Sequence, residues 1–419
     1  MLIISNECLS TVTSNGRTLR NFLDGWPREK IAQFCIRGNA PDYSACDNYY
    51  YVSDRDALNA FLKGKRASGQ MPRTTGGAAP AAGGAGGRNA LTMLLRDLVW
   101  NSMRWAGKPF RRWLDGYAPE LVLLQAGDCG FMYRLAESIS KRYNAPLVIY
   151  NSEGYYFKRY DYFKAKGLAH WCYPVFRGLF CRQFRRTMNR AAFAIYICHK
   201  LQRDYDREFD IASAVVYTAT ALEPGRSETH GTGFTVSYLG NLGVGRHEPL
   251  TDIARTLQSI SEDLRLDVYG RIPNETVRSA FEACPGIRCK GFVSYDEVGR
   301  VIRESDLIVH GENFSDFYRE DLKYAFSTKF ADSLAASKCF LLYAPKNMAC
   351  TEYLLDNDAA WVATDRQELA DILRRLYTQP EIRDRYRDNA AGLVRQNHCM
   401  ETNVQTFRNI LTTVWREGK

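Results

Sequence analysis

The stretch FSTKFADSL, residues 326–334, combines residue types that can hold an anion and a sugar. Lys329 supplies a cation, Asp332 follows three positions later, and Ser327 and Thr328 provide hydroxyl groups just before them. Apolar residues at a spacing of four predict a helix that starts at these hydroxyl residues. A cation in the first turn of a helix lowers stability unless an anion lies nearby, and a carboxylate accepts hydrogen bonds from sugar hydroxyls. The alternative is an exposed Lys–Asp pair, which helices carry often.

Two glycine-containing loops, STVTSNGRT (10–18) and YLGNLGVGRHEPL (238–250), each separate a predicted strand from a predicted helix. Glycine lets backbone N–H groups approach an anion, and the N-terminus of the following helix favours negative charge. An arginine at this place adds a planar fork that matches phosphate oxygens. A tight turn without a ligand is the alternative for both loops. The residues that we expect to contribute are Gly16 in the first loop and Gly240, Asn241, Gly243 and Arg246 in the second.

Four polar side chains lie at the ends of three apolar strands. Asp128 comes after LVLLQAG, Glu153 after LVIYN, and His310 and Glu312 end the strand DLIVHG. Ligands of open α/β sheets bind outside the carboxyl ends of the strands, so these groups are candidates for contact with a sugar or an acceptor. Capping or packing of the strand ends is the alternative for all four.

The order of elements predicts an α/β protein. Strand-like apolar runs alternate with helical patterns in both halves of the chain, which is typical of a doubly wound parallel sheet. We expect one such domain over residues 1–225 and a second over 226–395, with a helix over 396–419 that returns to the first domain. Residues 66–90 are rich in Gly, Ala and Pro and are expected to form a flexible insertion. Two such domains in series predict a ligand-binding cleft between them.

Basic and aromatic residues are interleaved in two segments, 99–117 and 155–190. The pattern suits an anionic membrane surface, where aromatic rings lie at the level of the headgroups. A solvated basic face over aromatic core residues is the alternative, and single-stranded nucleic acid suits the pattern less well. We therefore expect membrane contact as a hypothesis and no nucleic-acid partner.

The composition is that of an ordinary soluble globular protein of 419 residues, with 45% hydrophobic and 25% charged residues and a net charge of +9. The first residues read as a strand rather than a signal peptide, and no apolar run reaches the roughly 18 residues that span a bilayer. The twelve cysteines form no metal-binding spacing with the histidines, so we expect reduced thiols, a cytoplasmic location and no metal.

The ordered motifs YLGNLGVGR, LDVYG, GFVSYDEV, SDLIVHG and STKFADSLAASKCFLLY, within residues 234–395, resemble the donor-binding half of glycosyltransferases with two Rossmann-like domains, the GT-B architecture. The likeness is greatest to glycosyltransferase family 4 and its bacterial polysaccharide relatives. It implies that Arg246 and Lys329 contact the donor diphosphate as catalytic cations, that Asp332 binds the ribose, and that Gly16 faces the donor phosphates. It further implies a UDP-sugar donor, no metal and no other cofactor, and retention of configuration.

The sequence departs from the family pattern at two positions. Thr251 stands where many members carry a second basic residue, and Tyr324 stands where many carry a glutamate that contacts the sugar. We expect a glycosyltransferase that extends a glycan, with a lipid-linked acceptor at the inner membrane face as the hypothesis that the basic segments suggest. A sugar-nucleotide epimerase of the same fold, or an inactive membrane-associated partner in glycan assembly, remains the alternative.

Overall fold

The computed structural model describes residues 1–38, 41–64, 69, 88–163, 165–222, 233–326, 328–336 and 338–418. Most of the insertion expected at 66–90 lies outside these ranges, and so does the domain boundary expected between residues 225 and 226. The chain forms two compact units, Met1–Val216 with Asn403–Lys419, and Tyr217–Thr402. The boundary therefore falls earlier in the chain than the position expected from the sequence.

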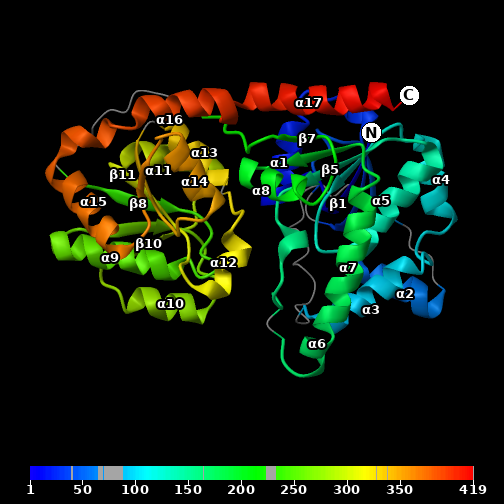
Figure 1. Ribbon diagram of the computed structural model, residues 1–419, viewed down its shortest axis with the longest axis horizontal. Coiled ribbons are helices and arrows are strands. Elements are labelled where there is room, and N and C mark those ends of the chain that lie inside the picture. The colour runs from blue at the N-terminus through cyan, green and yellow to red at the C-terminus, as the bar shows by residue number, and fades with distance from the viewer. Residues whose placement is uncertain are drawn as a thin grey trace. The chain divides into compact units, whose positions relative to one another are not determined.

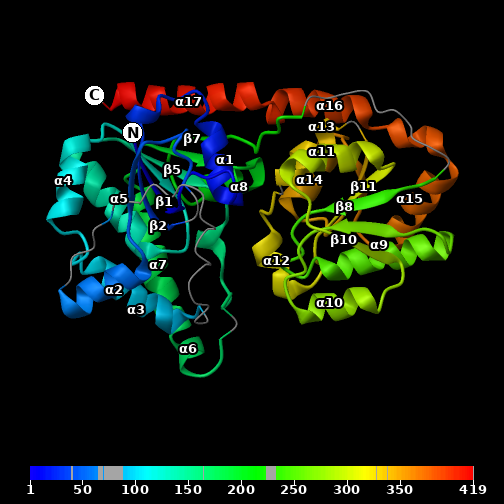
Figure 2. The same cartoon turned by 180° about the vertical axis from the view of Figure 1, so that it is seen from behind.

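The first unit is built on a parallel sheet with the strand order β3-β2-β1-β4-β5-β6-β7 within the described ranges (Figures 1 and 2). Its strands are β1 (Leu2–Glu7), β2 (Ala32–Arg37), β3 (Asn48–Tyr51), β4 (Val122–Gln125), β5 (Leu147–Asn151), β6 (Phe193–Tyr196) and β7 (Ser213–Val215). The order turns back between β1 and β4, which makes their carboxyl ends the switch point of a doubly wound sheet.

Helices cover both faces of this sheet. On one face, Phe22 of α1, Tyr150 of β5 and Phe407 of α17 pack ring against ring, whereas α5 packs against α3 and α7. The helices are α1 (Ser14–Phe22), α2 (Asp54–Lys63), α3 (Ala90–Asn101), α4 (Lys108–Tyr117), α5 (Gly130–Tyr143), α6 (Leu168–Trp171), α7 (Tyr173–Met188), α8 (His199–Asp206) and α17 (Met400–Glu417), with 3-10 turns at Arg28–Lys30 and Tyr155–Phe157.

The second unit repeats the plan with the parallel strand order β10-β9-β8-β11-β12-β13. Its strands are β8 (Val236–Leu239), β9 (Leu266–Tyr269), β10 (Ile287–Gly291), β11 (Leu307–Gly311), β12 (Cys339–Tyr343) and β13 (Trp361–Ala363). Its helices are α9 (His247–Ile260), α10 (Glu275–Glu282), α11 (Tyr295–Glu304), α12 (Asp316–Leu322), α13 (Thr328–Ala335), α14 (Ala349–Asp356), α15 (Arg366–Thr378) and α16 (Arg387–Leu393), with a 3-10 turn at Pro380–Asp384 and a π-turn at Val394–His398.

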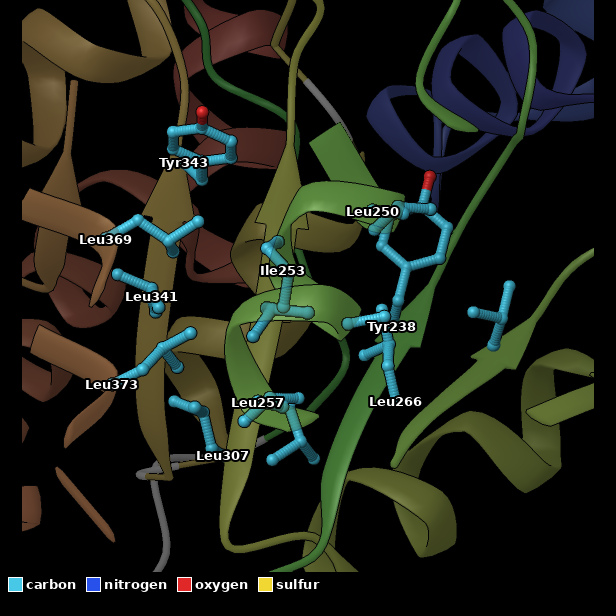
Figure 3. Close-up of a cluster of buried hydrophobic side chains, with 14 of the residues drawn as sticks. Tyr238, Leu250, Ile253, Leu257, Leu266, Leu307, Leu341, Tyr343, Leu369 and Leu373 are labelled. Carbon is cyan, nitrogen blue, oxygen red and sulfur yellow. The ribbon is translucent and has the colours of Figure 1, made fainter. Parts of the chain in front are cut away.

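Apolar residues of the second unit pack into one core between the sheet and its helices (Figure 3). Leu250, Ile253 and Leu257 recur along one side of α9 and meet Leu341 and Leu307 of the central strands. Because the strands of a doubly wound parallel sheet are covered on both faces, they are apolar throughout rather than alternating. This packing fixes the start of α9 beside the ends of β8 and β11, where the sheet order turns back.

Candidate functional site

The loop between β8 and α9 needs glycine at one position for two reasons. Gly245 has a φ of +71°, and a Cβ atom there would lie 2.5 Å from the side-chain nitrogen of Asn313 and from the ring of Tyr318. The amide of Asn313 donates to the carbonyl oxygen of Gly245 over 2.8 Å, which ties the loop to the segment after β11. Because Val244 is also left-handed, with a φ of +50°, the chain turns sharply and delivers Arg246 at the start of α9.

Arg246 is held by a carboxylate that follows β11. Its Nε and one terminal nitrogen donate to the two carboxylate oxygens of Glu312 over 2.9 and 2.8 Å, and His310 lies 3.0 Å from the same carboxylate. The side chains of Arg246 and Glu312 are 13% and 1% exposed. Burial alone would raise the pKa of Glu312, but the charge of Arg246 and the contact with His310 lower it overall. The guanidinium is thus fixed in orientation and stays charged.

Lys329 and Asp332 lie on one helix, as the sequence predicted, but Asp332 is buried. The Nζ of Lys329 is 3.5 Å from one oxygen of Asp332, and the hydroxyl of Thr220 donates to the other oxygen over 2.8 Å. The side chain of Lys329 is 22% exposed, whereas that of Asp332 is 3% exposed. The carboxylate expected to bind a ribose is therefore engaged within the second unit. Ser327 lies outside the described residues, and Thr328 begins α13.

Aromatic contacts connect these two groups of charged residues. The ring of Phe330 on α13 meets the ring of His310 edge to face at 4.9 Å between centroids, and Tyr238 of β8 lies on another side of His310 at 5.9 Å. Thus α13 packs against the end of β11 that carries His310 and Glu312. The geometry places the helix of Lys329 beside the strand ends from which Arg246 emerges.

The other loop residues serve mainly the turn itself. The N–H of Gly243 donates to the side chain of Asn241 over 2.8 Å, and that of Gly240 donates to the carbonyl of Tyr269 over 3.0 Å. Neither group is left to meet an anion, contrary to the expectation from the sequence. Within the described residues, the N–H groups of Asn241, Leu242, Val244 and Gly245 make no hydrogen bond, so the loop still has backbone donors to offer.

Gly16 lies inside α1 rather than in the loop before it, because the helix already begins at Ser14. The N–H of Gly16 donates to the side chain of Thr13, which caps the helix, over 3.2 Å. A Cβ atom at this position would lie 2.5 Å from the carbonyl oxygen of Cys8. Gly16 thus allows the helix to approach the end of β1 closely.

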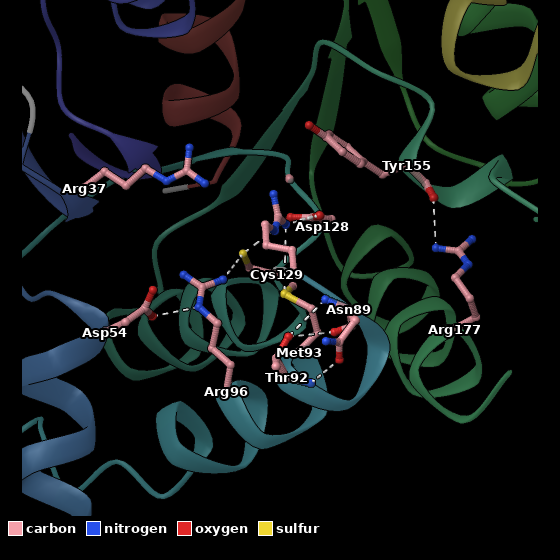
Figure 4. A network of polar contacts seen from close by, with 12 residues as sticks. Arg37, Asp54, Asn89, Thr92, Met93, Arg96, Asp128, Cys129, Tyr155 and Arg177 are labelled. Atoms are coloured by element: carbon pink, nitrogen blue, oxygen red, sulfur yellow. Dashed lines mark hydrogen bonds and ion pairs between the residues drawn. The ribbon is translucent and has the colours of Figure 1, made fainter. Parts of the chain in front are cut away.

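Asp128 belongs to a polar network at the carboxyl end of β4 (Figure 4). Arg88 forms an ion pair with Asp128, and Arg96 contacts both the sulfur of Cys129, at 2.8 Å, and the carboxylate of Asp54, at 2.7 Å. Asp97 on the same helix is buried enough for its pKa to rise to about 6, although the backbone N–H of Phe131 opposes the rise. This network joins α3 to the strand end. Glu153, the other candidate, is exposed and contacts Tyr155.

Several aromatic rings of the two basic segments lie in the core. Trp100, Trp105 and Phe110 are buried in the first segment, and four rings of α7 are buried in the second, namely Tyr173, Phe176, Phe180 and Phe184. Two of the arginines are engaged as well, since Arg186 and Arg190 both pair with the buried carboxylate of Glu137. These rings and these two arginines therefore have structural roles, and any surface for a membrane must consist of other residues.

Two residues at or next to this site were not apparent from the sequence. Thr220 reaches Asp332 from a position 112 residues away, and no local pattern marks such a pairing. His247 directly follows Arg246, and its Nδ1 atom is buried without a hydrogen-bond partner in the described chain.

Within the described residues, no cluster of His, Cys, Asp and Glu has the geometry to hold a metal ion. Arg246, Lys329 and backbone N–H groups are the groups of the second unit that could bind an anion.

Comparison with known proteins gives this arrangement a family context. Residues 246–409 match the family described as glycosyl transferase-like. No curated protein matches the sequence. Among solved structures, sucrose-phosphate synthase from Thermosynechococcus elongatus is similar at a TM-score of 0.65 and 9% identity, with 100% of both chains covered. Anabaena HepE in complex with UDP is similar at a TM-score of 0.65 and 11% identity, with 99% of this chain and 100% of that chain covered.

A glycosyltransferase from Rickettsia africae shares the architecture at a TM-score of 0.57 and 10% identity, with 99% of this chain and 98% of that chain covered. At such low identity these likenesses show the fold. They confirm the expected pair of Rossmann-like domains, and the match over residues 246–409 falls where the sequence motifs carried the resemblance. The shared architecture shows the GT-B fold, and the match over residues 246–409 supports a glycosyltransferase activity.

Proposed function

We propose that this protein transfers a sugar from a UDP-sugar to a growing, lipid-linked glycan in cell-surface polysaccharide synthesis, with retention of configuration. The observation that carries the donor part is Arg246, a largely shielded and oriented cation at the point where the order of the second sheet turns back. Ligands of doubly wound sheets bind at such switch points. The leaving group of a nucleotide-sugar is a diphosphate, which the fork of an arginine matches.

Contacts to the donor diphosphate would use hydrogen-bonding groups of the second unit that can still bind an anion. Glu312 engages two N–H groups of Arg246, and a guanidinium has further donors that can meet phosphate oxygens. Lys329 adds a second cation, and the N–H groups of Val244 and Gly245 add neutral donors. These groups would stabilise the negative charge that develops on the leaving diphosphate. Glu312 and His310 act as positioning residues for Arg246 rather than as contacts to the sugar.

The choice of uridine is supported by relatives of the same fold. HepE of Anabaena has been solved with UDP, with UDP and glucose, and with UDP-glucose. On the acceptor side, Asp128 and Glu153 follow β4 and β5 of the first unit and are the candidates for contact with the glycan. We place the reaction in the cytoplasm, at the inner face of the membrane.

One observation favours a second candidate, an inactive partner in glycan assembly. Arg246 and Asp332 already have intramolecular partners, and the position expected to hold a sugar-binding glutamate is the buried Tyr324. Such a protein would keep the fold while lacking turnover.

A panel of nucleotide-sugars separates these functions. The full chain is incubated with UDP-, GDP-, ADP- and CMP-sugars and a membrane extract that supplies acceptor, and nucleotide release is followed together with the fate of the sugar. Release of UDP with incorporation of the sugar into a lipid-extractable product supports the proposal. An epimerised sugar in place of a transferred one contradicts it, and binding without release under every condition favours the inactive partner.

A further inference from the structure

An apolar surface lies on three helices of the first unit. Six apolar side chains there are each more than half exposed, and they are distributed over α3, α6 and α7. Helix α3 packs against both α6 and α7, so the three helices share one surface, and α6 continues α7 at the end remote from the sheet (Figure 1). The six residues, which we call the apolar patch, are Leu95, Leu98, Leu168, Trp171, Val175 and Leu179.

The spacing within α6 and α7 shows that the patch is an ordered stripe. Leu168, Trp171, Val175 and Leu179 follow one another at intervals of three and four residues, which places them on one side of consecutive helical turns. The opposite side of α7 is filled by the buried rings of the core. The helix thus has an inward apolar face that packs and an outward apolar stripe that is exposed, and such exposed patches usually mark interaction sites.

The charged side chains that α6 and α7 themselves carry are basic, although the carboxylate of Asp161 contacts His170 of α6. Between residues 165 and 190 the sequence contains no Asp or Glu. Lys166 precedes α6, and Arg182 follows Leu179 by three residues on the outward side of α7. Both are exposed, and neither forms an ion pair with any described residue. An apolar stripe bordered by cations, with tryptophan as its most exposed member, matches an anionic lipid surface.

We propose that the apolar patch docks this protein on an anionic bilayer, with Trp171, Val175 and Leu179 among the acyl chains and Lys166 and Arg182 at the lipid phosphates. The biological sense of this contact rests on the proposed function, because a lipid-linked acceptor lies at a membrane. The physical basis is separate, since it uses none of the residues of the donor site. None of the helices in the described ranges combines the length and apolarity needed to cross a membrane, so docking would be peripheral.

Charge also argues against two other occupants. A second copy of the chain would bring like charges together across the patch, which opposes association. The insertion at residues 66–90 contains arginine but no Asp or Glu, and it has few large apolar side chains to cover the patch. An anionic bilayer supplies both an apolar interior and the opposite charge.

The test uses the full chain and vesicles of phosphatidylcholine with or without phosphatidylglycerol. We compare the wild type with two patch variants. The triple variant Trp171→Ser, Val175→Ser, Leu179→Ser changes the patch on α6 and α7. The double variant Leu95→Ser, Leu98→Ser changes the patch on α3. The control is Phe292→Ser, because Phe292 is 64% exposed in the second unit. We expect sedimentation with the anionic vesicles to fall about tenfold or more in the triple variant, to fall in the double variant and to be unchanged in the control.

A second measurement reports insertion of one side chain. Lipids with brominated chains should quench part of the tryptophan fluorescence of the wild type, and Trp171→Phe should keep binding but lose that part of the quenching. Absence of wild-type binding to anionic vesicles, or equal binding of both patch variants, would overturn the proposal. A patch variant that turns a wild-type dimer into a monomer would overturn it too. Unchanged UDP titration in the variants would show that the donor site is intact, which separates this proposal from the proposed function.

Discussion

At the scale of single residues, the central feature is a buried ion pair that fixes a cation. Arg246 and Glu312 are both largely removed from water and are joined by two hydrogen bonds. Desolvation of two charges offsets most of their attraction, so such a pair contributes little net stability, whereas removal of one partner is strongly destabilising. We interpret the pair as a device that orients the guanidinium for an anion.

Replacement of Glu312 by glutamine should destabilise the second unit, because Arg246 would keep its charge without a buried counter-charge. We expect a loss of about 3 kcal/mol in the free energy of unfolding. The folded pKa of Glu312 is lowered, so its contribution is present above the unfolded pKa and is lost as the pH falls through the folded pKa. Urea unfolding at a series of acidic pH values should therefore show a steeper loss in the wild type than in Glu312→Gln, and parallel curves would refute this account.

Replacement of Arg246 by lysine tests the bidentate geometry of the guanidinium rather than its charge. Lysine can supply one cationic group but not two parallel donors to a carboxylate, so we expect UDP to bind about tenfold more weakly. The matched control is Arg300→Lys, since Arg300 lies exposed on α11 and pairs with Glu304 one turn away. Titration calorimetry on both variants gives the comparison. Equal affinity in wild type and Arg246→Lys would remove Arg246 from the donor site.

At the scale of elements, the sequence predicted what local patterns encode. The strands and the helix at residues 328–335 were expected because apolar spacing determines them. The pairings Arg246–Glu312 and Thr220–Asp332 join residues 66 and 112 positions apart, and they depend on which strand ends the topology brings together. The early start of α1 was missed because Thr13 caps the helix, a role that its neighbours Ser10 and Ser14 could equally have taken.

The bond between Thr220 and Asp332 should be needed for a stable α13. Thr220→Val keeps the shape of the side chain but removes the hydroxyl that donates to the buried carboxylate of Asp332, and we expect a loss of about 1–3 kcal/mol. Thr256→Val is the control, because the hydroxyl of Thr256 only donates to a carbonyl of its own helix. Denaturant unfolding compares the two. A similar small effect in both would mean that Asp332 does not depend on Thr220.

At the scale of the whole molecule, the chain passes between the two units at residues 216–217 and 402–403. Within the second unit, the segments next to these passages pair with each other. Thr220 bridges Cys399, and the Nδ1 of His398 contacts the carbonyl oxygen of Thr218 at 2.8 Å, while its Nε2 lies 2.8 Å from the hydroxyl of Tyr353. Two α/β units were predicted from alternating patterns, but this pairing between distant segments was not.

His398 should make the stability of the second unit depend on pH. Burial lowers the pKa of His398 from 6.5 to about 4, although its bond to Thr218 opposes the shift. Between these values the unfolded chain binds the proton and the folded chain does not, so stability falls as the pH drops from about 6.5 towards 4. The full effect is about 3 kcal/mol. His398→Gln should flatten this part of the curve in thermal unfolding followed by circular dichroism, and an unchanged slope would contradict the assignment.

The most direct test of the donor site is calorimetric titration of the wild type and Lys329→Ala with UDP, GDP, ADP and CMP. Lys108→Ala is the matched control, because Lys108 is an exposed lysine at the start of α4 in the other unit. We predict that UDP binds the wild type and the control alike, and that Lys329→Ala binds it at least about tenfold more weakly. Binding of no nucleotide diphosphate, or equal binding in Lys329→Ala, would contradict the proposal that Lys329 and Arg246 hold the donor.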